Sequence, residues 1–195
     1  MKNQVNYILI TDSATESLTL AEVKTYLRID GTDYDNILTP LIKTVRQLAE
    51  KITGRDFIDK TWKTYLDYFP GREGIELRKS KLQSVTSINY YNKNTLTLLN
   101  AADYYITNEA DYSSIYLIEG QSYPATDNRR QAVEITFVSG YGADADAVPQ
   151  ALKQAMLSHV AYLFENTGDC TDSGEAQFKQ MYFPYILSQM FLGVC

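Results

Sequence analysis

The order of apolar and polar residues divides the chain into a helical part, a β part and a second helical part. Apolar residues recur at helical spacing over residues 20–28 and 34–53, which predicts two amphipathic helices. From residue 57 the period changes to two, and short, aromatic-rich segments continue to residue 139, as is typical of strands. Helical spacing returns over residues 149–166 and 178–191. The pattern therefore predicts an α+β fold.

Local signals predict where the first two helices begin and end. Thr19 is followed three residues later by Glu22, a capping box that predicts the start of the first helix. We expect Gly31 to end that helical region and Asp33 to cap the second helix. Gly54 is expected to end the second helix.

Two prolines fall inside predicted helices and should disturb them, because proline removes a backbone donor. Pro40 predicts a kink or a restart of the second helix near Thr39. Pro184 predicts a break or restart in the C-terminal segment. Pro149 is instead well placed as the first residue of its helix.

The β part is expected to form an antiparallel sheet of six or seven short strands, without the βαβ alternation of a nucleotide-binding fold. Asn92-Lys93-Asn94 predicts a hairpin turn. A further short strand is expected at residues 7–10, within a polar N-terminal arm. The expected strands of the β part cover residues 61–69, 74–78, 82–91, 95–99, 104–107, 114–118 and 133–139.

We interpret residues 1–195 as a single domain, a small helical bundle with an inserted antiparallel β-sheet region. Its expected parts are the N-terminal arm (1–17), N-terminal helices (18–56), a β insertion (57–142) and C-terminal helices (148–195). Gly140, Gly142 and Pro149 lie where the last strand leads into a helix. We expect these three residues to act as a structural junction that fixes how the β insertion meets the helices.

Composition and charge narrow the classes of function. The chain has a formal net charge of −6, and an acidic protein gains little from phosphate counterion release, so nucleic acid is not expected as the main ligand. Two cysteines in a chain of 195 residues do not make a disulfide framework. The apolar runs are too short for a signal peptide or a membrane span. We therefore expect a soluble protein made in a reducing cytoplasm.

Catalytic and metal-binding motifs are missing from the sequence, so we expect no enzyme activity, no metal and no cofactor. The only histidine, His159, lies on an apolar helix face and is expected to be packed rather than to act as a ligand or base. Acidic groups at Asp30, Asp33 and Asp35 lack the spacing of a calcium loop. An enzyme would need a carboxylate pair such as Asp103 with Glu134, which nothing in the sequence brings together.

Two other features have a structural and a functional interpretation. The basic residues Arg78, Lys79 and Lys81 fit a solvated strand edge or a weak contact with DNA or an acidic partner. The 16 tyrosines fit core packing and subunit contacts, or base stacking. Base stacking by the tyrosines leads to the alternative function, a β-rich module that binds single-stranded nucleic acid or glycan through a Tyr-rich sheet.

The C-terminal segment is apolar almost all round, which predicts either a partner-binding helix or a helix that closes the bundle against residues 41–52. The candidate partner-binding residues are Phe178, Met181, Tyr182, Tyr185, Ile186, Met190 and Phe191.

The order of several motifs resembles the head–tail connector (adaptor or head-completion) proteins of tailed bacteriophages and prophages. Residues 18–30 read LTLAEVKTYLRID, residues 61–71 read TWKTYLDYFPG and residues 77–92 read LRKSKLQSVTSINYYN. The stretches VEITFVSGYG and VPQALKQAMLSHVAYLFEN follow at 133–142 and 148–166. The resemblance covers about residues 17–166. Pro40, the acidic linker at 167–175 and the apolar end at 180–195 depart from the family.

The resemblance implies a structural virion protein without catalytic residues. It implies a ring of copies, twelve in the virion, that lies under the portal protein and extends the DNA channel. The ring would present an attachment surface for the next connector, stopper or tail protein, while DNA passes without sequence-specific binding. The protein would be found at the head–tail interface of the virion, and in the host cytoplasm during assembly. No membrane partner is implied.

Overall fold

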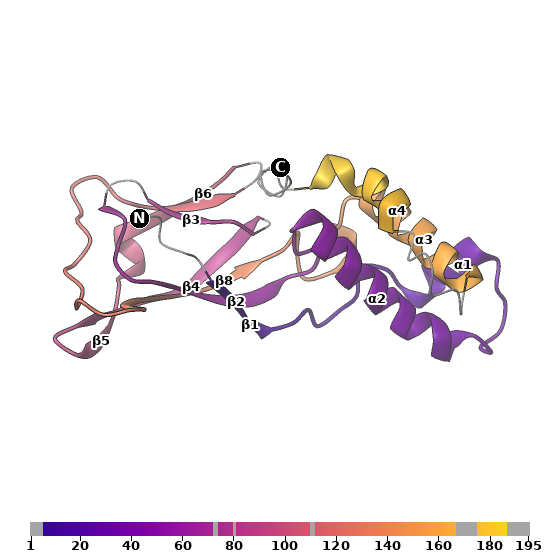
Figure 1. The fold of residues 1–195 in the computed structure, drawn as a ribbon, viewed down its shortest axis with the longest axis horizontal. Coiled ribbons are helices and arrows are strands. Elements are labelled where there is room, and N and C mark those ends of the chain that lie inside the picture. The colour runs from indigo at the N-terminus through magenta and orange to yellow at the C-terminus, as the bar shows by residue number, and fades with distance from the viewer. Residues whose placement is uncertain (1–5, 72–73, 80, 110–111, 167–174, 187–195) are drawn as a thin grey trace. The chain divides into compact units, whose positions relative to one another are not determined.

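The two hydrophobic periods of the sequence give two units of different architecture, drawn in Figure 1. The computed structural model describes residues 6–71, 74–79, 81–109, 112–166 and 175–186, with only the backbone at 175–177. The sheet unit contains the residues up to Asp12 together with Asp59–Gly140. The helical unit contains Ser13–Ile58 together with the residues from Tyr141 onward. The chain thus passes between the units three times.

The sheet unit consists of two antiparallel sheets that face each other as two layers (Figure 1). A five-stranded sheet has the order β1-β2-β8-β4-β5, and a three-stranded sheet has the order β3-β7-β6. The strands are β1 (Asn6–Thr11), β2 (Lys60–Leu66), β3 (Ile75–Leu77), β4 (Leu82–Asn92), β5 (Thr95–Leu98), β6 (Tyr104–Asn108), β7 (Ser113–Leu117) and β8 (Val133–Ser139). One 3₁₀ turn, η2 (Ala101–Asp103), precedes β6.

The core of the sheet unit lies between its two layers. Val133, Ile135 and Phe137 of the central strand β8 are fully buried, as their alternation predicts. They pack with Ile115 of β7 and Leu77 of β3 from the facing sheet. The sequence indicated one sheet, whereas the described residues form two, because alternation predicts which face of a strand is buried but not which sheet it joins.

The hairpin between β4 and β5 has the turn that the sequence predicts. Asn92 pairs with Thr95, and the two residues between them, Lys93 and Asn94, have φ of 51° and 60°, as a two-residue hairpin turn requires. Both of their backbone N–H groups donate to the Asp127 carboxylate at 2.7 Å. This carboxylate therefore fixes the turn and, with it, the position of β5.

The helical unit packs its helices around one apolar core (Figure 1). Leu38 and Val45 from the second helix meet Leu152 and Val160 from the third. The capping box is present: the Thr19 hydroxyl accepts from the Glu22 N–H, and the Glu22 carboxylate accepts from the Thr19 N–H. The elements are α1 (Leu20–Leu27), α2 (Asp35–Thr53), α3 (Gln150–Glu165), α4 (Glu175–Tyr182) and the 3₁₀ turns η3 (Ala145–Ala147) and η4 (Phe183–Tyr185).

Several predicted helix boundaries were wrong. Arg28, in the left-handed conformation, ends α1 in place of Gly31. No side chain caps α2, which begins after Tyr34 rather than at an Asp33 cap. The helix also continues through Pro40 without a restart, while a kink at Pro40 stays a prediction. Pro149 is the N-cap of α3 instead of its first residue.

Candidate partner-binding surfaces

One side of α4 belongs to the core of the helical unit. Phe178 and Tyr182 are buried there. The Phe178 ring stacks on the imidazole of His159, with the centroids 4.1 Å apart, and the Tyr182 Oη lies 3.3 Å from His159 Nδ1. These two candidate residues therefore stabilise the monomer. Ile186, at the end of η4, is also buried.

His159 is packed, as the apolar spacing of α3 predicts. Its side chain is 1% exposed, and burial lowers the pKa of His159 from 6.5 to about 4, because desolvation disfavours the charged imidazolium. The imidazole is therefore neutral at pH 7. Burial likewise raises the pKa of the Tyr182 hydroxyl. Both groups act as packed aromatic rings rather than as charges.

The other side of α4 and η4 faces solvent. Met181 is 41% exposed and Phe183 is 56% exposed, while Tyr185 is half-buried against the helical core. The Tyr185 carbonyl accepts a hydrogen bond of 2.7 Å from Arg55 Nε, which ties η4 to the end of α2. Met190 and Phe191 lie outside the described residues. The segment thus has a buried and an exposed side, and Pro184 ends its helix as predicted.

The basic residues Arg78, Lys79 and Lys81 of the sheet unit contact residues of the same unit. Arg78 forms an ion pair with Glu76 at 2.9 Å, with both side chains exposed. The Lys79 ammonium lies 3.7 Å from the centroid of the Trp62 ring, a cation–π contact. Lys81 is exposed, and its carbonyl accepts from the Gly140 N–H. This arrangement favours a strand edge over a DNA-binding patch.

The two junction glycines lie where the backbone passes closely against a neighbour. A Cβ on Gly140 would lie 2.7 Å from the backbone of Asp59, and a Cβ on Gly142 would lie 2.6 Å from the Cβ of Ala147. Both distances are shorter than real Cβ contacts allow, so glycine is required for local packing. That Gly140, Gly142 and Pro149 set the angle between sheet and helices stays a prediction.

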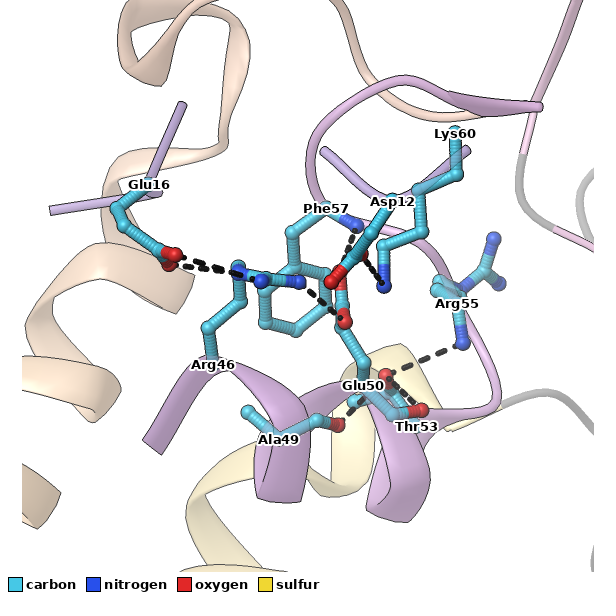
Figure 2. Close-up of polar contacts among 9 residues, drawn as sticks. All are labelled: Asp12, Glu16, Arg46, Ala49, Glu50, Thr53, Arg55, Phe57 and Lys60. Carbon is cyan, nitrogen blue, oxygen red and sulfur yellow. Dashed lines mark hydrogen bonds and ion pairs between the residues drawn. The ribbon is translucent and has the colours of Figure 1, made fainter. Parts of the chain in front are cut away.

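Sequence reasoning missed a buried charge network in the helical unit. Arg46 of α2 is 1% exposed. Figure 2 shows its guanidinium between two carboxylates, Glu16 at 2.6 Å and Glu50 at 2.9 Å. Glu50 also accepts from the Phe57 N–H at 3.0 Å. The spacing of Arg46 and Glu50, four residues apart and next to the apolar stripe, is the signal that could have indicated this pair.

A second ion pair missed by sequence reasoning lies within the sheet unit. Lys60, the first residue of β2, is largely buried and pairs with Asp12 at 3.1 Å (Figure 2). Asp12 directly follows β1. The pair therefore links the ends of two neighbouring strands at the point where the chain leaves the unit.

Exposed aliphatic side chains concentrate on the two outer strands of the five-stranded sheet, which the sequence did not indicate. Five of the seven exposed leucines and isoleucines among the described residues lie on β1 or β5. All residues of β1 except Tyr7 are exposed. The seven residues are Ile8, Leu9, Ile10, Ile37, Leu96, Leu98 and Ile118.

The tyrosines of the sheet unit are mainly used in packing. Tyr7 contacts Phe137 edge-to-face, with centroids 6.0 Å apart. Tyr123 stacks on Phe69 at 4.5 Å, and burial raises the pKa of Tyr123 to about 12. Tyrosines held in this way do not offer the free ring faces that base stacking needs.

Metal-binding clusters and membrane-spanning helices are absent from the described part of the chain. No group of three or more His, Cys, Asp or Glu residues lies close enough there to hold a metal ion. Within the same residues, none of the helices is both long and apolar enough to span a bilayer. Glu134, half of the carboxylate pair that an enzyme would need, forms an ion pair with Lys63 at 3.3 Å.

Comparison with known proteins places both units in one family. Residues 16–180 match the family model described as head completion protein. The chain belongs to this family. The resemblance to head–tail connector proteins is thereby confirmed, together with the α+β fold. The family description names a structural step, the completion of a head, and no reaction. No curated protein matches the chain.

Solved structures with the same fold come from gene transfer agent (GTA) particles. A chain in the neck of an empty GTA particle, computed with C6 symmetry, is 20% identical with a TM-score of 0.71, over 91% of this chain and 94% of that one. A chain in the native GTA virion is 19% identical with a TM-score of 0.74, over 94% and 95%. A chain in the native neck, computed with C12 symmetry, is 21% identical with a TM-score of 0.64, over 90% and 94%. At these identities the likeness establishes the fold.

Proposed function

We propose that this protein is a structural component of a virion neck, where copies form a ring under the portal protein. The ring extends the DNA channel and provides the attachment surface for the next connector or tail component. The observation that carries the proposal is the family match over residues 16–180, which spans most of both units and begins after β1. Chains of the same fold lie in necks computed with C6 and C12 symmetry, which supports a ring of twelve copies.

The exposed side of α4 and η4 is the surface we assign to the portal. Met181 and Phe183 present a thioether and an aromatic ring to solvent, side chains that are enriched in the centres of interfaces. Phe178 and Tyr182 behind them are held by the monomer core. The portal would therefore contact a surface that the monomer core already holds in place. We call this exposed side of α4 and η4, with Met181 and Phe183, the exposed ridge.

The charge of the chain supports a channel through which DNA slides. Residues 143–195 carry two basic and six acidic side chains, a net charge of −4. A surface of this sign does not retain DNA through its phosphates. Arg78 is paired with Glu76 and Lys79 lies over the Trp62 ring, so these contacts also weaken any attraction of the two cations for DNA.

The test is assembly with the portal protein of the same particle. Native mass spectrometry of the mixture should show twelve copies bound per portal ring, without requiring that the free protein oligomerise. Met181→Ser with Phe183→Ser should reduce this binding at least tenfold while the far-UV circular dichroism spectrum is unchanged. A portal that binds no copies of the wild-type chain would refute the proposal.

Truncation separates the exposed ridge from the segment that follows it. Deleting residues 187–195 removes Met190 and Phe191 but keeps the described core. If binding survives this deletion and is lost in the Met181 and Phe183 double variant, the ridge makes the contact. If both proteins bind as wild type does, the portal contacts another surface.

A further inference from the structure

The two outer strands of the five-stranded sheet are unguarded edges. Among the described residues, β1 pairs only with β2 and β5 pairs only with β4, so one side of each strand has unpaired backbone N–H and C=O groups. Natural proteins commonly protect such edges with lysine, proline or inward-pointing charges. Neither Asn6–Thr11 nor Thr95–Leu98 contains a charged residue or a proline.

The two edges also match each other in length and in side-chain pattern. β5 has four residues, and β1 is regular over 6–9 before its register shifts between Leu9 and Thr11. Tyr7 packs into the core of the sheet unit, so Ile8 points to the outer face. Leu96 and Leu98 pair with Tyr91 and Asn89.

The register places Ile8 of β1 and Leu96 and Leu98 of β5 on the same outer face, whereas Leu9 shares the face of Tyr7. Ile88 packs in the core, so its neighbour Asn89 points outward, and Leu98 opposite Asn89 points outward with it. Ile8 is 47% exposed and Leu98 is 62% exposed. A pairing of β5 with the β1 of another molecule would therefore form one continuous aliphatic stripe.

We propose that β5 of one copy pairs with β1 of the next copy, so that the five-stranded sheets of neighbouring subunits join edge to edge. The inference rests on the proposed ring and adds the surface through which the ring closes. Because β1 and β5 are different strands, the contact is head-to-tail, and head-to-tail contacts form rings when the rotation closes. Strand addition supplies backbone hydrogen bonds, and the aliphatic stripe supplies apolar burial.

Strand direction makes the proposed pairing parallel. Each neighbouring pair in the order β1-β2-β8-β4-β5 is antiparallel, so β1 and β5 run in the same direction within one sheet. Asn6 at the start of β1 and Leu98 at the end of β5 lie at the same level of the sheet, that of Glu134. Copies placed with their outer faces aligned, and shifted along the strands by about the length of β5, therefore join β5 to β1 in parallel. The alternative contacts, β1 with β1 or β5 with β5, would be two-fold and would stop at a dimer.

Cysteine cross-linking in the portal complex tests the pairing. The native cysteines, Cys170 and Cys195, are first replaced by serine. Ile8→Cys and Leu98→Cys are then introduced together, and the complex is treated with a short bis-maleimide, which tolerates a shift in register. Adjacent strands lie about 4.8 Å apart, so the double variant should give a ladder of covalent oligomers on a denaturing gel.

The controls decide between the possible contacts. Ile37→Cys with Leu98→Cys is the matched control, because Ile37 is exposed to nearly the same degree as Ile8, at 48%, but lies on α2. It should give no ladder, and each single variant should remain monomeric. A ladder in the control, or dimers from Ile8→Cys or Leu98→Cys alone, overturns head-to-tail pairing.

The result also separates this inference from the proposed function. If native mass spectrometry shows the wild-type ring on the portal but the double variant gives no ladder, the ring stands and the edge pairing is wrong. If neither a ring nor a ladder forms, both proposals fall. A ladder from the Ile8→Cys and Leu98→Cys double variant, with none from the controls, supports both the ring and the edge pairing.

Discussion

The helical unit and the sheet unit differ in where their aliphatic side chains are exposed. In the helical unit even a charged side chain, Arg46, is enclosed and paired, and the apolar residues Phe178 and Tyr182 of the last helix fill the core. In the sheet unit, aliphatic side chains remain on the outer strands, as at Ile8 and Leu98. A helix can turn its apolar stripe inward, whereas an edge strand always leaves one side unpaired. Contact surfaces between copies are therefore expected on the sheet.

The largest effect on stability is expected at Phe178, compared with Phe183 on the other side of the same segment. Phe178→Ala removes a buried ring stacked on His159 and should lower the free energy of unfolding by about 3–5 kcal/mol. Phe183→Ala, at an exposed position, should change it by less than about 0.5 kcal/mol. Urea denaturation followed by circular dichroism measures both. Equal effects would mean that the two sides of this segment do not differ.

The two arginine–glutamate pairs give the next comparison. Arg46→Met removes a guanidinium that is paired with two carboxylates, one of them the buried Glu50, and should cost about 3–5 kcal/mol. Arg78→Met breaks an exposed pair with Glu76 and should cost less than about 1 kcal/mol. Chemical denaturation of each variant provides the values.

A double variant checks the physical reason for the Arg46 effect. Arg46→Met with Glu50→Gln removes both charges and keeps an acceptor for the Phe57 N–H. It should recover part of the stability lost in Arg46→Met, because the buried carboxylate that loses the Arg46 guanidinium is replaced by a neutral amide. A double variant less stable than the single one would argue that Arg46 acts through packing.

The buried imidazole predicts an acid-dependent loss of stability in the helical unit. The pKa of His159 is 6.5 in its ordinary state and about 4 in the fold, so the unfolded chain binds the proton first as the pH falls. The free energy of unfolding should be unaffected well above pH 6.5 and should decrease between pH 6.5 and 4, on the order of 3 kcal/mol in total. Urea denaturation at a series of pH values, compared with His159→Phe, isolates this step.

The smallest effect on the monomer is expected at the strand edges. Leu98→Thr keeps a residue that favours strands and removes only exposed apolar surface, so stability should change by less than about 0.5 kcal/mol. Assembly on the portal should nevertheless weaken. Ile118→Thr, exposed but just outside β7, should leave both quantities unchanged. Mass photometry of the portal complexes compares the two variants.

Local patterns in the sequence predicted the features that depend on neighbouring residues. The alternation of Val133, Ile135 and Phe137 predicted their burial, and the capping box of Thr19 and Glu22 predicted the start of α1. The hairpin after Asn92 was predicted because only a few residue types tolerate its backbone conformation. Each of these signals lies within a few residues of the chain.

Features that depend on distant residues could not be predicted in this way. The pairing of β1 with β2 joins Asn6 to Tyr65, and the burial of Arg46 needs Glu16 from the segment before α1. The aliphatic edges became visible only with the strand order, because Leu96 and Leu98 fit a buried strand equally well. For the C-terminal segment, the sequence left open partner binding or core packing. The described residues place Phe178 and Tyr182 in the core, and partner binding by the exposed side stays a proposal.

The strand order has a consequence for the time at which the protein can fold during its synthesis. β8 lies between β2 and β4, although it is the last strand of the sheet unit to leave the ribosome. Neither neighbour can complete its ladder before Ser139 has emerged, and α3, which packs on α2, emerges later still. The sheet unit is therefore expected to complete its folding only after Ser139 has been made, and the helical unit only after α3 has been made. Of the paired strands, β2 waits longest for a partner, because Lys60 pairs with Ser139.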